Sequence, residues 1–160
     1  MITPAQKFIQ ASKVKYKEYE YKCTVDHNYG EFAAESLGIE PGKVFKTIVL
    51  VHEKTFVTAV TPADGMISMK KAARLLSLKG LEMAKPADVT RITGYIIGGV
   101  SPLGQKRKTI TIINESAMKY DEILVSGGRR GFSIGLSPTD LVKLTDAKVG
   151  DFLEHSNQKK

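Results

Sequence analysis

The sequence predicts a single α+β domain in which helices pack around one mixed central β-sheet. The chain has 160 residues, the length of one domain with a single core. Its composition, 42% hydrophobic and 26% charged, is ordinary for a folded globular protein. Segments with helical spacing of apolar residues alternate along the chain with segments that have strand spacing. No repeat or linker divides residues 1–160, although the polar end, 155–160, is expected to fray.

The first two elements expected are a helix and a strand. Thr3 is a suitable N-cap, Pro4 suits the first helical position, and Gln6 completes a capping box. A strand is expected next in KYKEYEY, because Tyr19 and Tyr21 are spaced with period two.

A second helix is expected in NYGEFAAESLG, with Asn28 as its cap, Glu31 at the reciprocal position and Gly38 at its left-handed end. The run KVFKTIVLVH is almost continuously apolar and β-branched, which predicts a central strand buried on both faces. Its expected neighbour is TFVTAVTP, reached through a hairpin around Glu53 and Lys54.

Three more helices are expected in the second half of the chain. Ser68 is the cap of SMKKAARLLSLKG, which ends at Gly80, and PADVTRITG ends at Gly94. Ser137 is the cap of SPTDLVKL, where Asp140 closes a capping box. Further strands are expected at 95–100, 109–113 and 122–126.

Charge and cysteine content narrow the class of protein. The formal net charge of +7 favours an acidic partner, most commonly nucleic acid, although a solvated lysine-rich face would give the same balance. Cys23 is the single cysteine and no Cys or His pair has zinc spacing, so we expect no disulfide, metal or cofactor. The N-terminus is not a secretory signal, and no apolar run approaches the ~20 residues of a membrane helix. Together these features predict a cytoplasmic protein.

Lys46 is the first candidate for chemistry, because almost all its neighbours in VFKTIVLV are apolar. Burying an ammonium group is costly, so a lysine in a covered strand must either extend to solvent past its apolar stem or open into a cavity. In the second case Lys46 would be an anion binder or an electrophile.

Two glycine-rich segments follow strands and carry cations beside them. We call residues 94–104 the first glycine segment and residues 125–135 the second. Glycines allow close approach of a ligand and expose N–H groups, which could hold a phosphate or a developing oxyanion. The alternatives are a bulge and a plain turn for the first segment, and a β-hairpin with arginines at its tip for the second.

Several features typical of hydrolases are missing from the sequence. The sequence has no G-x-S-x-G elbow and no Asp–His pair suited to a catalytic triad, and its three histidines are scattered. Cys23 has no base near it in sequence. Any reaction would therefore need little from a side-chain nucleophile.

The motifs VFKT, AVTPADG, KKAARLL, TGYIIGGVSPLGQKRKT and VSGGRRG occur in order over about Thr3 to Ala147. In these motifs the chain resembles the YbaK family of Cys-tRNA(Pro) deacylases, which is related to the editing domain of bacterial prolyl-tRNA synthetases. The resemblance implies the fold of this editing domain, and it implies that the protein removes misplaced amino acids from tRNA in trans. It also implies tRNA as a partner, and prolyl-tRNA synthetase as a further one.

The resemblance assigns site residues as well. The family's invariant lysine, with a catalytic role, falls on Lys46. Its substrate-binding positions fall on Tyr21, Gly94, Tyr95, Gly98, Gly99, Ser101, Pro102, Gly104, Ser126, Gly127, Gly128 and Arg129. From the residues alone, Tyr21 is expected to pack in the sheet rather than react, although its hydroxyl could reach a site.

The family's chemistry agrees with the missing triad. In cysteine-specific members the thiol of the substrate is thought to attack its own carbonyl, so that a lysine and backbone N–H groups suffice. One departure concerns specificity, since Ser133 and Gly135 stand where such members often have acidic residues. Editing of Ala-tRNA(Pro), or a module that binds RNA ends or the synthetase without catalysis, therefore stay open as alternatives.

Overall fold

The structure is a computed structural model that describes residues 2–155, and the predicted fraying of 156–160 lies outside this range. Within it the predicted α+β class is confirmed. The helices are α1 (Pro4–Ser12), α2 (Tyr29–Leu37), α3 (Met69–Leu75), α4 (Pro86–Thr93) and α5 (Pro138–Thr145), with 3-10 turns at Pro41–Lys43 and Glu115–Lys119. The strands are β1 (Tyr16–Glu20), β2 (Phe45–His52), β3 (Thr55–Pro62), β4 (Glu82–Met83), β5 (Ile110–Asn114), β6 (Ile123–Arg129), β7 (Phe132–Leu136) and β8 (Lys148–Gly150).

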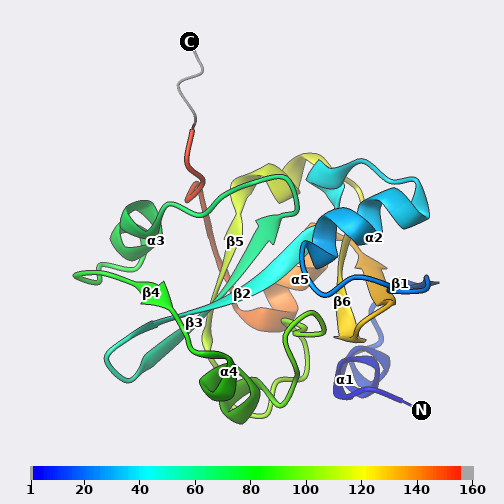
Figure 1. Ribbon diagram of the computed structural model, residues 1–160, viewed down its shortest axis with the longest axis horizontal. Helices are drawn as coiled ribbons and strands as arrows, with labels where there is room; N and C mark the ends of the chain where they lie inside the picture. The colour runs from blue at the N-terminus through cyan, green and yellow to red at the C-terminus, as the bar shows by residue number, and fades with distance from the viewer. Residues whose placement is uncertain (1, 156–160) are drawn as a thin grey trace.

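The strands form two sheets, which corrects the single central sheet expected from the sequence. A five-stranded mixed sheet has the order β4-β2-β3-β5-β8, and an antiparallel three-stranded sheet has the order β1-β7-β6. In Figure 1, β1 and β6 lie to the right of β2, β3 and β5. The two sheets touch where Val44, just before β2, forms an isolated parallel bridge with Leu124 of β6.

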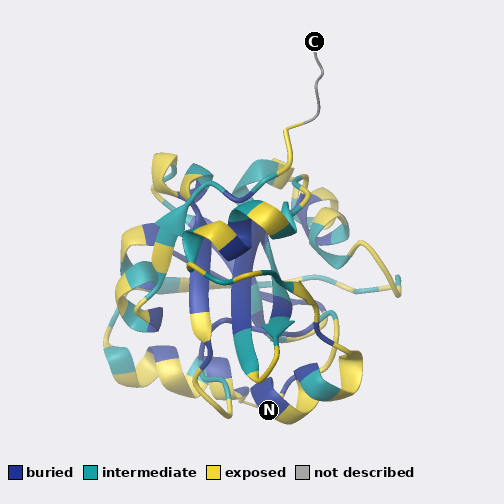
Figure 2. Cartoon of the chain, turned by 90° about the vertical axis from the view of Figure 1, so that its left-hand side faces the viewer, coloured by how far each residue is buried: buried dark blue, intermediate teal, exposed yellow. Residues whose placement is uncertain are grey.

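The core lies between the sheets and under the helices that cover them. Its largest cluster includes the fully buried Ile9 of α1, Val60 of β3, Ile134 of β7 and Leu141 of α5. Figure 2 shows buried strands at the centre and exposed residues mainly on the surrounding helices and loops. No helix in residues 2–155 is both long enough and apolar enough to cross a membrane.

Elements with strong local signals form as predicted. The Thr3 side chain accepts a hydrogen bond from the Gln6 backbone N–H, and the Gln6 side chain accepts one from the Thr3 N–H, which completes the capping box of α1. The β2–β3 hairpin turns at Glu53 and Lys54, and α4 ends at Gly94 with φ 84°.

The predicted strand at 95–100 is wrong, since these residues form an irregular loop. Its apolar pattern resembles a strand, but Gly98 has φ 90°, which breaks an extended backbone. Strand β2, which the sequence predicts to be buried on both faces, is only partly buried. Lys46, Thr47 and Ile48 of β2 are half-buried, and β3 is the more deeply buried strand.

One predicted helix end is wrong as well, and two residues at predicted N-cap positions make no side-chain cap. Helix α3 ends at Leu75 rather than near Gly80, because Ser77 takes up the left-handed conformation and the Leu78 N–H donates to the Ala73 carbonyl. Asn28 is itself left-handed, and its side chain does not cap α2. The side chain of Ser137 makes no cap hydrogen bond to α5 either.

Candidate active site

A cavity of about 380 Å³ lies along an uncovered edge of β2. On that edge β4 pairs with Leu50 and Val51, the Val49 carbonyl accepts from the Ala84 N–H at 3.0 Å, and Val44 is bridged to β6. The backbone between these contacts lines the cavity, together with α2, the β6–β7 hairpin and the loop at 97–100. An unpaired strand edge offers N–H and C=O groups to a ligand, so this opening is suited to binding.

Lys46 lies in this cavity, half-buried under helix α2. Gly30 allows the close approach of the helix, because a Cβ atom there would lie 3.1 Å from the Ala63 Cβ and 3.5 Å from the Lys46 Cβ. Burial lowers the pKa of the Lys46 amine, and the negative charges of Glu31 and Asp64 partly oppose this effect. The lysine is therefore desolvated within a cavity, as one of the two sequence interpretations requires.

The two glycine segments meet at one wall of the cavity. A Cβ atom at Gly98 would lie 2.8 Å from the Tyr29 ring and from the Arg130 Nε, and one at Gly99 would lie 2.9 Å from the Arg129 Cα. Glycine is needed at both positions because the backbone of the first segment packs directly on the second segment and on α2.

Arg130 fastens the first glycine segment in place. Its Nε and Nη2 atoms both donate to the Ile97 carbonyl, at 3.0 Å and 2.8 Å. Its guanidinium also lies 4.9 Å from the centre of the Tyr29 ring, a cation–π distance. One exposed side chain thus joins the loop, the hairpin and α2.

The other residues of the first glycine segment hold the loop through buried contacts. The Tyr95 hydroxyl donates to the Leu103 carbonyl at 2.6 Å, and burial raises the pKa of Tyr95, so the hydroxyl stays a donor. Ser101 is fully buried and accepts from the Leu103 N–H. Pro102 is buried too, and Gly104 packs against the Pro4 carbonyl of α1.

The second segment is the β-hairpin that the sequence left as an alternative. Arg129 pairs with Phe132 across its turn, and the ladder is irregular between Ser126 and Arg129, where Gly127 and Gly128 lie. The Thr3 hydroxyl donates to the Gly127 carbonyl at 2.6 Å, which ties the start of α1 to this irregularity.

Four of the residues assigned from the sequence line the cavity. They are Tyr21, Lys46, Gly98 and Ser126. The other nine lie outside its lining: Gly94, Tyr95, Gly99, Ser101, Pro102, Gly104, Gly127, Gly128 and Arg129.

Arg129 and Tyr21 show what the assigned side chains do. The Arg129 guanidinium stacks over the Phe132 ring at 4.6 Å and lies 3.8 Å from Glu20, away from the cavity. Tyr21 packs 6.1 Å from the Phe32 ring, and burial raises the pKa of its hydroxyl. Tyr21 thus both packs against α2 and lines the cavity.

Sequence reasoning missed the roles of Glu31 and Arg130. Glu31 is the one carboxylate lining the cavity among residues 2–155, although in the sequence it only suggested a helix start. The Thr47 hydroxyl, next to the lysine, is buried and has no hydrogen-bond partner within that range. No three His, Cys, Asp or Glu side chains of the described chain come together as a metal site.

The glycine N–H groups where the two segments meet differ in their hydrogen bonds. The Gly99 N–H donates to the Ile96 carbonyl at 2.8 Å, and the Gly128 N–H donates to the Ser126 hydroxyl at 3.2 Å. The Gly98 N–H makes no hydrogen bond within residues 2–155. A half-buried cation and a spare amide donor therefore share one cavity, an arrangement suited to stabilising a developing oxyanion.

Comparison with known proteins identifies the family of the chain. Residues 29–144 match the family model of the aminoacyl-tRNA editing domain. The chain is 43% identical over 150 residues to EbsC of Enterococcus faecalis, named as a candidate Cys-tRNA(Pro)/Cys-tRNA(Cys) deacylase, with 93% of this chain and 92% of that protein covered. It is 29% identical over 150 residues to the proline–tRNA ligase of Caldicellulosiruptor bescii, covering 91% of this chain and 24% of the ligase.

Solved structures share the fold. The structure of a candidate trans-editing enzyme for prolyl-tRNA synthetase superposes with a TM-score of 0.85 at 27% identity, covering 95% of this chain and 96% of that one. A further match, the hypothetical protein APE2540, has a TM-score of 0.84 at 22% identity and supports the fold alone. The chain therefore belongs to the aminoacyl-tRNA editing domain family and is an aminoacyl-tRNA deacylase, as its motifs predict.

Proposed function

We propose that this protein removes cysteine from mischarged tRNA(Pro) in trans, at the cavity beside β2. The observation that carries the proposal is that Lys46, Gly98 and Ser126, from three separate segments, line one cavity. The name of EbsC supports the cysteinyl substrate, and the similarity to proline–tRNA ligases supports tRNA(Pro) and a functional link to that synthetase.

The cavity suits the aminoacyl end of a tRNA. Its volume of about 380 Å³ lies in the range of small-ligand sites. The charged amine of Lys46 and the free N–H of Gly98 would stabilise negative charge on the ester carbonyl oxygen as it becomes tetrahedral. Since an aminoacyl ester is already activated, positioning and charge stabilisation supply the main catalytic effects.

The nucleophile in this proposal is the substrate's own thiol. Its sulfur forms a bond to the carbonyl carbon, the ester C–O bond breaks, and the electron pair stays on the ribose oxygen. That oxygen takes up the proton that the thiol loses. The protein's own thiol is not needed, since Cys23 lies outside the cavity lining and its Sγ contacts the Val25 carbonyl.

Glu31 would hold the α-ammonium group of the substrate. Ser133 lines the cavity at a position where cysteine-specific relatives often have an acid, so the carboxylate has to come from elsewhere. Gly135 does not line the cavity, and a Cβ atom there would lie 2.5 Å from a Glu122 oxygen. The lining carboxylate on α2 is thus placed to replace the missing one.

The experiment is a deacylation panel with tRNA(Pro) charged with Cys, Ala or Ser. We expect rapid release of cysteine alone, because alanine has no side-chain nucleophile and the hydroxyl of serine is a much weaker nucleophile than a thiol. Lys46→Ala should lower kcat/KM on Cys-tRNA(Pro) by about 10²- to 10³-fold, as loss of one oxyanion donor does, with little change in melting temperature. Lys70→Ala, an exposed lysine of α3, is the matched control and should have no effect.

Each other result has a definite meaning. Release of alanine would contradict the thiol mechanism and support the alternative specificity. Binding of tRNA without release of any amino acid would support the non-catalytic module. Full activity of Lys46→Ala would remove the lysine from the mechanism.

A further inference from the structure

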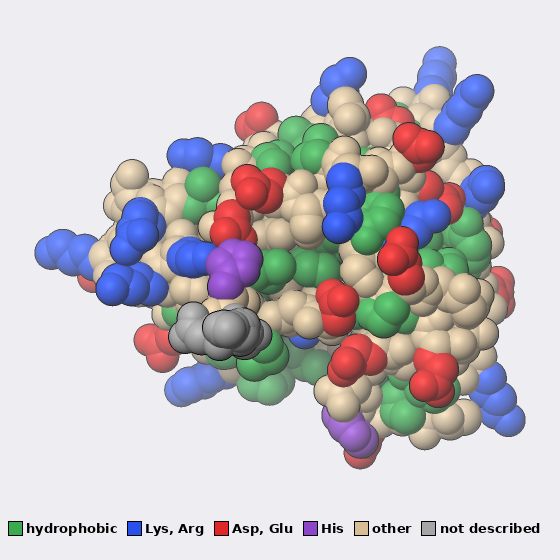
Figure 3. Space-filling model, turned by 90° about the horizontal axis from the view of Figure 1, so that it is seen from above, with side chains coloured by type: hydrophobic (Ala, Val, Ile, Leu, Met, Phe, Trp, Pro, Cys, Tyr) green, Lys and Arg blue, Asp and Glu red, His purple; other side chains and the backbone are tan. Residues whose placement is uncertain are grey.

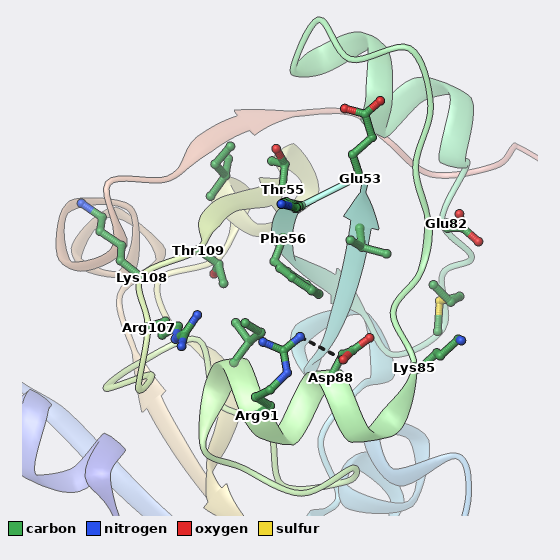
Figure 4. A pocket seen from close by; sticks show the side chains of 15 residues that line it. Glu53, Thr55, Phe56, Glu82, Lys85, Asp88, Arg91, Arg107, Lys108 and Thr109 are labelled. Carbon is green, nitrogen blue, oxygen red and sulfur yellow. Dashed lines mark hydrogen bonds and ion pairs between the residues drawn. The ribbon is translucent and has the colours of Figure 1, made fainter.

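A second, larger hollow of about 750 Å³ adjoins the cavity. It lies at the far end of β2, beside Val51, and Met83 of β4 lines both spaces. Its walls come from the β2–β3 hairpin tip, from α4 and from residues 107–110 (Figure 4). We call this hollow the basic groove.

The side chains of the basic groove carry an excess of positive charge. Its cations are Lys54, Lys85, Arg91, Arg107 and Lys108, and its carboxylates are Glu53, Glu82 and Asp88. Arg91 pairs with Asp88 at 2.9 Å, while the other four cations form no ion pair within residues 2–155. Figure 4 shows Arg107 and Lys108 on one side of the groove and Lys85 on the other.

Two of these cationic residues are held by contacts within the fold. The Arg107 N–H donates to the Ile92 carbonyl at 3.0 Å, which fixes the cationic segment to the last turn of α4. The Arg91 guanidinium is held by Asp88 and lies 5.9 Å from the centre of the Phe56 ring. The Arg91 guanidinium and the backbone at Arg107 are therefore held beside the hollow.

Another face of the molecule carries charges of both signs. On the face seen from above, acidic and basic side chains are interspersed (Figure 3). The net charge of +7 thus does not by itself make every face basic, and the groove is a place where unpaired cations surround a hollow.

We propose that the basic groove binds backbone phosphates of the tRNA acceptor arm while the aminoacyl end occupies the Lys46 cavity. This rests on the proposed function, because an RNA end in the cavity must continue across the adjoining surface. Lys46 and Val51 are five positions apart on β2, or about 17 Å at ~3.3 Å per residue. That distance is suited to the few nucleotides that separate the esterified end from the paired stem.

The test measures binding of uncharged tRNA(Pro) transcript as a function of salt, which needs no catalysis. The variant is Arg107→Gln/Lys108→Gln, in which both side chains are exposed. Each lost phosphate contact lowers the slope of log K against log salt by about 0.7 to 0.9, so the double variant should lose about 1.4 to 1.8. Affinity at low salt should fall on the order of tenfold. The control is Lys15→Gln/Lys17→Gln, at exposed positions in and beside β1, which should keep the full slope.

Two further measurements fix the location. A short aminoacyl-CCA oligonucleotide lacks the stem, so the groove variant should cleave it at the wild-type rate. Phosphate ethylation should interfere with binding in the acceptor arm. An unchanged salt slope, an equal loss in the control variant, slowed cleavage of the short substrate, or interference confined to other arms would each overturn the proposal. Failure to deacylate any substrate would instead contradict the proposed function, since binding is measured separately.

Discussion

Adding one methyl group where the glycine segments touch tests whether their packing builds the site. In Gly99→Ala the new Cβ atom would lie 2.9 Å from the Arg129 Cα, 3.1 Å from its carbonyl carbon and 3.2 Å from the Arg130 nitrogen. All three are backbone atoms, so no side-chain rotation can relieve the contact. Gly99 does not have a positive φ, and the effect therefore comes from lack of space alone.

The expected cost of this overpacking is about 1–3 kcal/mol. For a domain of this size the melting temperature should fall by about 2–12 °C. If the segments separate to relieve the contact, the same free energy lowers kcat/KM on the editing substrate by about 5- to 150-fold.

Gly80→Ala is the matched control. No atom lies within 4 Å of a Cβ built at Gly80, so this variant should be as active as the wild type and equally stable or slightly more so. Thermal melts and single-turnover deacylation of both variants decide the matter. Wild-type stability and activity of Gly99→Ala would refute the inference that the two segments must interlock.

Two further substitutions test the clamp and the lysine. Arg130→Met removes the bonds to the Ile97 carbonyl and the contact with Tyr29, so the free energy of local opening of the first glycine segment should fall by about 1–2 kcal/mol. Amide hydrogen exchange in that segment should then be about 5- to 30-fold faster, whereas Arg129→Met should leave the exchange unchanged. If the charged form of Lys46 is required, kcat/KM should fall as the pH rises through the lowered pKa of this lysine. The negative charge of Glu31 raises that pKa, so Glu31→Gln should move the fall in kcat/KM to lower pH. The pH profiles of the wild type and of Glu31→Gln are measured as deacylation rates corrected for uncatalysed hydrolysis. Glu35 is exposed one turn later on α2, and Glu35→Gln is the control that should leave the pH profile of kcat/KM unshifted. An unshifted profile in Glu31→Gln would contradict the effect of Glu31 on the pKa of Lys46.

The parts of the fold that could be predicted have signals within a few residues of chain. The capping box at Thr3, the two-residue turn at Glu53 and Lys54, and the glycine stop at Gly94 each depend on neighbouring residues alone. Where a tertiary contact competes, the local pattern failed. Residues 95–100 have an apolar pattern typical of a strand, yet the Ile97 carbonyl is bonded to the Arg130 side chain instead of a neighbouring strand.

The same distinction between local and tertiary signals applies to the residues of the site. Lys46 could be found because an ammonium group in an apolar strand needs an explanation, and the cavity supplies one. Glu31 could not be found, because it reaches the cavity only through the close packing of α2 on β2 that Gly30 allows. Such packing depends on residues far apart in sequence.

The division of the strands into two sheets is what makes a site possible beside Lys46. If all strands had formed one continuous sheet, a neighbouring strand would pair with the edge of β2 and use up its donors and acceptors. Instead β6 bridges only Val44, while β4 and Ala84 bond only to Val49, Leu50 and Val51, so residues 45–48 between these contacts face a cavity. The glycine segments then close that cavity from the other side, because their backbones pack without side chains between them. The long motif is thus better explained by the shape of this wall than by contacts to substrate, since of its glycines only Gly98 lines the cavity.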